Sequence, residues 1–175
     1  MKLLKTTALL CATALVSTPA LAADTELSNV EVVVDLSAID GSNALSYWPD
    51  LEKDLAAALT ERAAVDPVSE APRIRVEINK ISVDGDTLLA DSGEFNRMEG
   101  TVVIYESLNS DGSTVKTTGD ERLNSFPVRL SAQTADTPIE EGWTMYVPPS
   151  KDKFYSVMVD TYADTVLERV EDKQN

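Results

Sequence analysis

The chain has 175 residues, of which 30 are acidic and 15 are basic, so its formal net charge at pH 7 is −15. It contains no histidine and a single cysteine, Cys11. A field of this sign repels nucleic acid and anionic membranes, and no run of basic residues offsets it, so we expect no nucleic-acid binding. The length suits one domain with a core of its own.

Residues 1–22 have the three-part pattern of an export signal. Lys2 and Lys5 are followed by an apolar run, and small residues before Ala23 predict cleavage after Ala22. We therefore expect a cleaved signal peptide over 1–22, a single α+β domain over 23–175, and a soluble product in the periplasm or outside the cell.

Two alternatives for this segment fit the pattern less well. Acylation at Cys11 would require cleavage after the large side chain of Leu10, within the apolar run. Retention as a membrane anchor would require about 20 apolar residues, and the run is shorter than that. We expect no transmembrane segment after cleavage.

Signal cleavage would change the chemistry that the domain can perform. It would remove Cys11, Lys2 and Lys5, which leaves 30 acidic and 13 basic residues and a net charge of about −17. Disulfides are then excluded, as is His or Cys chemistry at nucleophilic, metal or near-neutral acid–base sites.

The N-terminal half predicts a strand, a helix and a second strand. Alternating apolar residues predict a strand over 30–36. Helical spacing predicts a helix that begins near 46–49 and ends before Asp66, because a residue that precedes proline disfavours the α conformation. Residues 73–83 predict a long strand with a one-residue phase change after Ile78, as a β-bulge produces.

The C-terminal half predicts further strands and one long helix. In chain order we expect a turn at 84–86, a strand within 94–106, a hairpin turn at 109–113, an antiparallel return over 113–118, and an extended stretch over 122–130. A helix over about 151–171 should follow, with Ser150 placed to cap it.

This order of elements predicts an α+β fold in two layers. One face of a sheet supplies the common apolar surface that two amphipathic helices need. We expect a mostly antiparallel, mixed sheet of about four to five strands with both helices on one face. If strand 30–36 and strand 73–83 pair in parallel, the helix between them makes a right-handed crossover.

Residues 131–149 lack a regular period and contain the candidate partner-binding residues. Such a long loop in a compact domain is often functional, and aromatic residues and Met are enriched in protein interfaces. Two interpretations stay open: these residues contact a partner, or they cover an open end of the core. Tyr47 and Trp48 raise the same question, and Trp48 could instead fasten the start of the helix. The candidate residues of the loop are Trp143, Met145, Tyr146 and Pro148.

No motif in the sequence indicates catalysis or a bound cofactor. The G-x-S-x-G and S-x-x-K signatures of serine hydrolases do not occur. Acidic pairs such as Glu140-Glu141 arise by chance in so acidic a chain. The acidic residues at 84, 86, 91 and 94 do not match a calcium loop, since Leu89 stands where glycine is required. We nominate no catalytic, cofactor-binding or metal-binding residue.

These observations favour an exported, non-enzymatic binding or accessory module of the bacterial cell envelope, which engages a protein or another envelope component. One alternative is a periplasmic protein that binds a small ligand or a cation, with the 131–149 loop over an acidic pocket. Another is a hydrolase that uses two carboxylates.

Overall fold

A computed structural model describes residues 25–39, 41–107, 121–132 and 154–174, together with the backbone of residues 144–146. Ten helices and strands lie in these segments. In chain order they are β1 (Glu26–Leu27), β2 (Asn29–Val34), α1 (Ala44–Tyr47), α2 (Leu51–Arg62), β3 (Ala64–Val65), β4 (Arg73–Ser82), β5 (Arg97–Tyr105), β6 (Arg122–Ala132), β7 (Thr144–Tyr146) and α3 (Phe154–Gln174).

The main sheet has five strands in the order β2-β4-β5-β6-β7. The long pairings of β4 with β5 and of β5 with β6 are antiparallel, whereas β2 pairs with β4 in parallel, as does β7 with β6. The predicted mixed sheet of an α+β fold is therefore confirmed, and the parallel pairing of β2 with β4 is the arrangement on which a crossover through the first helix was conditional. The strands β1 and β3 form a separate two-stranded parallel sheet, in which β3 directly follows the C-terminal end of α2.

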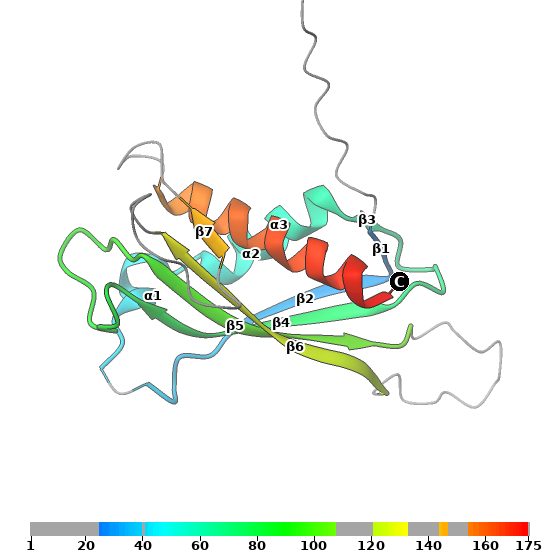
Figure 1. The fold of residues 1–175 in the computed structure, drawn as a ribbon, viewed down its shortest axis with the longest axis horizontal. Helices are drawn as coiled ribbons and strands as arrows, with labels where there is room; N and C mark the ends of the chain where they lie inside the picture. The colour runs from blue at the N-terminus through cyan, green and yellow to red at the C-terminus, as the bar shows by residue number, and fades with distance from the viewer. Residues whose placement is uncertain (1–24, 40, 108–120, 133–143, 147–153, 175) are drawn as a thin grey trace, which may run out of the picture.

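Both long helices cover the same face of the sheet (Figure 1). Along β4 the side chains alternate, so that Ile74, Val76 and Ile78 are buried toward the helices. On α3 a stripe that includes Met158 and Tyr162 is buried against this surface. The core thus lies between one helix layer and one sheet face.

The local sequence signals along β4 and its turn are confirmed. The register between β4 and β5 shifts between Ile78 and Lys80, where the apolar set changes phase. After β4, Val83 and Asp86 exchange two backbone hydrogen bonds of 2.8 Å around Asp84 (φ +50°) and Gly85 (φ +96°). Positive φ at both central residues is the geometry of a type I′ hairpin turn.

The first predicted helix is present as α2, but α2 begins at Leu51 and not near residues 46–49, because the chain forms the separate short helix α1 before it. Trp48, which precedes Pro49, has ψ 64° and lies outside the α region. The clash between the proline ring and the preceding residue therefore ends α1 before α2 begins. The short strands β1, β3 and β7 were not predicted. The predicted return over 113–118, Ser150 and the first residues of the last predicted helix lie outside the described residues.

Gly100 allows α3 to approach the sheet closely. A Cβ atom at Gly100 would lie 2.5 Å from the carbonyl oxygen of Glu77 and 2.5 Å from the hydroxyl of Tyr162. Tyr162 is fully buried, and its hydroxyl is 3.5 Å from the carbonyl oxygen of Val128. Burial raises the pKa of Tyr162 far above its usual range. Glycine therefore makes room on the sheet for the largest side chain of the helix stripe.

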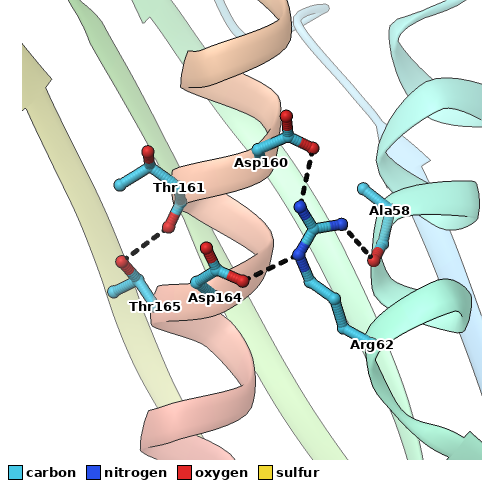
Figure 2. Close-up of polar contacts among 6 residues, drawn as sticks. All are labelled: Ala58, Arg62, Asp160, Thr161, Asp164 and Thr165. Atoms are coloured by element: carbon cyan, nitrogen blue, oxygen red, sulfur yellow. Dashed lines mark hydrogen bonds and ion pairs between the residues drawn. The ribbon is translucent and has the colours of Figure 1, made fainter. Parts of the chain in front are cut away.

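Arg62, at the end of α2, joins the two helices (Figure 2). Its Nη2 donates to Asp160 at 2.8 Å, its Nε donates to Asp164 at 2.7 Å, and its Nη1 donates to the carbonyl oxygen of Ala58 at 2.9 Å. The two carboxylates, one helical turn apart on α3, hold the pKa of Arg62 above its ordinary value although burial acts in the opposite direction. These contacts place one guanidinium between the helices.

We predict that Arg62→Gln lowers the free energy of unfolding by about 1–2 kcal/mol, because charge-assisted hydrogen bonds are lost but both aspartates are half exposed. Urea denaturation measures the change. Lys53→Gln removes the same charge from an exposed position of α2 and should change stability by less than about 0.5 kcal/mol. Equal effects of the two variants would contradict a specific helix–helix contact.

We predict that Gly100→Ala destabilises the fold by about 1–3 kcal/mol or more, because the added methyl group overlaps backbone as well as the Tyr162 hydroxyl. Thermal and urea unfolding measure the loss. Adding Tyr162→Phe to Gly100→Ala removes one of the two overlaps, so the double variant should lose less stability than the two single changes together. Strict additivity of the two changes would contradict the contact.

Candidate functional site at the aromatic end

Four aromatic rings from three segments of the chain contact one another. The helix α1 and the connection from β4 to β5 lie at the same end of the molecule (Figure 1). Trp48 stacks on Tyr155 with ring centroids 4.1 Å apart and contacts Phe154 edge to face at 5.7 Å. Phe154 in turn contacts Phe95 edge to face at 5.6 Å. We call this set the aromatic cluster; it fastens the start of α3 to the break between α1 and α2.

Trp48 is anchored within this cluster. Its indole Nε1–H donates a 2.7 Å hydrogen bond to the carbonyl oxygen of Gly93. Gly93 has φ +66°, and a Cβ there would lie 2.9 Å from Tyr47, so the close approach requires glycine. Both Tyr47 and Trp48 are partly buried against the core. These two residues therefore take part in packing, as one of the sequence interpretations of Trp48 had it.

Tyr155 links the cluster to α2 by a polar contact. Its hydroxyl donates a 2.7 Å hydrogen bond to Oδ2 of Asp54. Burial is the largest cause that raises the pKa of Tyr155 well above its ordinary range; the hydrogen bond to Asp54 and the charges of Asp54 and Asp50 raise it further. Tyr155 is therefore held neutral and acts as a donor between the helices.

The structure places two of the four predicted loop residues, and only by their backbone. Met145 and Tyr146 lie in β7, where they pair in register with Ser131 and Ala132 of β6. The backbone N–H of Ala132 donates a 2.8 Å hydrogen bond to the carbonyl oxygen of Asn96, the neighbour of Phe95 in the cluster. The backbone of Tyr146 therefore lies beside Ala132, which is hydrogen-bonded to the residue that follows Phe95. Trp143 and Pro148 lie outside the described residues.

Two exposed leucines lie at this same end. The side chain of Leu45 on α1 is 42% exposed, and that of Leu88 after the β4 turn is 60% exposed. Their segments are joined by Asn43, whose side chain accepts from the N–H of Leu89 at 2.7 Å and donates to its carbonyl oxygen at 2.9 Å. Sequence reasoning missed this pair, because Leu45 and Leu88 lie in segments that meet only in the folded chain.

The acidic turn makes local hydrogen bonds. Oδ1 of Asp84 accepts from the side-chain amide of Asn96 at 2.7 Å, and Oδ1 of Asp86 accepts from the N–H of Leu88 at 2.9 Å. Within the parts of the chain that the structure describes, no three His, Cys, Asp or Glu side chains gather as metal ligands would. In those same parts, no helix is both long and apolar enough to cross a membrane.

No protein-family model matches the chain, and no curated protein matches it. The function is therefore inferred from the geometry of the described residues.

We predict that the free energy of unfolding falls less steeply with rising pH in Tyr155→Phe than in the wild type. A tyrosine whose pKa is raised in the folded state stabilises the fold fully below its unfolded pKa of about 10, and this contribution is lost as the pH rises toward the folded value. Urea denaturation between about pH 8 and pH 12 measures the slope. Asp54→Asn keeps a hydrogen-bond acceptor for Tyr155 but removes a negative charge. The slope of its unfolding free energy against pH should therefore lie between the slopes of the wild type and of Tyr155→Phe. Identical slopes for wild type and Tyr155→Phe would contradict the assignment.

Proposed function

We propose that the protein is an exported, non-enzymatic binding module of the bacterial cell envelope, which contacts a protein or another envelope component through its aromatic end. The export signal over 1–22 supports the location. The lack of histidine, and of cysteine beyond Cys11, supports binding over catalysis, because the side chains most used at catalytic sites are missing.

The observation that carries this proposal is the exposed pair Leu45 and Leu88 on two segments that Asn43 holds together. Exposed apolar side chains that are held on a rigid support are typical of contact surfaces. The aromatic cluster supplies such a support in the neighbouring segments, since stacked and hydrogen-bonded rings fix α1 and the start of α3. Trp143, Met145, Tyr146 and Pro148 remain the candidate partner-binding residues of the 131–149 loop.

Burial of both leucines in a complex would contribute substantially to affinity. Full burial of one leucine side chain contributes about 1.5–3 kcal/mol. Loss of both contributions weakens binding by a factor of at least about ten. Polar replacements at these two positions are thus a direct test of the surface.

We predict that Leu45→Ser combined with Leu88→Ser lowers the recovery of a bound partner about ten-fold or more in affinity pull-downs from envelope extracts. The bait is the full chain, tagged after Asn175 and purified after export. The matched control is Val68→Ser, which replaces an exposed apolar residue (80% exposed) in the connection between β3 and β4. Circular dichroism and the Tm show that each variant is folded.

Three results would contradict this function. One is that Val68→Ser lowers the recovery of the bound partner as much as the double variant does. Another is failure of the full chain to reach the periplasm. The third is a large rise in Tm with calcium, a sugar or an amino acid, because a ligand that binds only the native state raises its stability; that result would favour the small-ligand alternative. Trp143→Ala tests the loop in the same assay.

A further inference from the structure

The exposed leucines Leu45 and Leu88 lie in two segments whose charged residues are all acidic. Residues 41–50 and 83–96 contain five acidic residues and neither lysine nor arginine. All but one of these five are exposed to solvent. The apolar pair therefore stands among negative charges, which we call the acidic rim. The acidic rim consists of Asp50, Asp84, Asp86, Asp91 and Glu94.

Hydrogen bonds fix two carboxylates of the acidic rim in the turn that precedes Leu88. Oδ1 of Asp86 accepts from the backbone N–H of Leu88 at 2.9 Å. Oδ1 of Asp84 accepts from the side-chain amide of Asn96 at 2.7 Å, and Oδ1 of Asn96 accepts from the backbone N–H of Asp84 at 2.9 Å. Negative charge thus keeps a fixed position close in the chain to a leucine that is 60% exposed.

The charges of the acidic rim are not paired within the folded chain. None of its carboxylates forms an ion pair with another residue that the structure describes. The helix layer differs, because Asp160 and Asp164 share the guanidinium of Arg62. The nearest basic residues along the chain, Lys53 and Arg97, lie outside both segments. The carboxylates of the rim can therefore pair with cationic groups of a partner.

An apolar pair of this kind restricts the charge of the molecule that covers it. Burial of Leu45 and Leu88 brings the partner close to the acidic rim, where acidic groups of the partner would be repelled. Lysine and arginine suit both parts of the surface, because their aliphatic stems pack on apolar groups while their charged ends reach carboxylates. The phosphates of an anionic membrane or of a nucleic acid would be repelled by the same carboxylates.

We propose that the aromatic end binds a basic segment of a partner protein, in which apolar side chains are interspersed with lysine or arginine. The apolar side chains cover Leu45 and Leu88, and the cationic side chains face the acidic rim. This inference rests on the function proposed for the aromatic end and adds the chemical class of the partner.

The two parts of the surface act on different rate constants. Exposed ion pairs contribute little to equilibrium affinity, but a field of opposite sign speeds the encounter of two molecules. This effect weakens as salt rises, since charges more than about 8 Å apart are largely screened at about 0.15 M. Burial of the leucines acts on the bound state and therefore slows dissociation. The acidic rim should thus set the association rate, and the leucines the dissociation rate.

The test is stopped-flow fluorescence anisotropy of a labelled peptide that has Leu at positions i, i+3, i+4 and i+7 and Lys between them. We expect Asp50→Asn with Asp91→Asn to lower the association rate constant about three-fold or more at about 0.05 M salt, and by less than about 1.5-fold at about 0.3 M. Both side chains are exposed, and neither makes a hydrogen bond within the described part of the chain. Leu45→Ser with Leu88→Ser should instead raise the dissociation rate constant about ten-fold or more.

The matched control is Glu70→Gln with Asp172→Asn, which changes the net charge by the same amount away from the aromatic end. Glu70 lies in the connection from β3 to β4 and Asp172 near the end of α3, both at the opposite end of the molecule from α1 (Figure 1). We expect this control to change the association rate constant by less than about 1.5-fold at either salt concentration. Equal slowing by the control would overturn the role of the acidic rim.

Three further results would overturn this inference. The first is absence of saturable binding by the Leu–Lys peptide, and the second is equally tight binding of a peptide with Ser in place of Leu or with Glu in place of Lys. The third is sedimentation of the protein with vesicles of phosphatidylglycerol and phosphatidylethanolamine. If any of these occurs while Leu45→Ser with Leu88→Ser still loses the partner in pull-downs, the proposed function stands and only the class of partner is wrong.

Discussion

The two long helices bury the same face of one sheet, and the rest of the structure depends on this contact. The chain has no cysteine after Cys11, so no disulfide within the domain supplements it. Its tightest point is the approach of Tyr162 to Gly100, where the sheet lacks a side chain and the helix presents a large one. Arg62 completes the helix layer, because one guanidinium holds two carboxylates of α3 against the end of α2 (Figure 2).

At the end of the molecule that holds the aromatic cluster, side-chain contacts hold α3 against the neighbouring segments of the helix layer. The start of α3 is fixed by stacking of Tyr155 on Trp48 and by the hydrogen bond from Tyr155 to Asp54. The same contacts make the end rigid, and a rigid support lowers the entropy that binding costs. Leu45 and Leu88 remain outside the packed rings. Packing of the domain and the proposed apolar contact surface thus depend on the same residues.

A sheet covered on one side only has two different faces. The helix side supplies the core and carries the excess of acidic groups on its outer surface. The other side carries alternate residues of β4, β5 and β6, among which arginine and lysine outnumber glutamate. The negative net charge of the whole chain therefore does not describe the electrostatic potential at each surface.

The sequence by itself determined the long elements and their stacking into an α+β fold, because periodicity marks which side of a strand or helix is buried. The phase change after Ile78 even located the bulge. Strands of two or three residues, such as β7, are too short to show a period in the sequence. The sequence analysis also missed the break between α1 and α2 at Trp48, although the proline that follows Trp48 disfavours a helical conformation there. Only the tertiary structure decided which distant residues meet: Arg62 with Asp160, and Ser82 with Arg97 and Ser131. Register and helix docking set such contacts, and both depend on the packing of the whole chain.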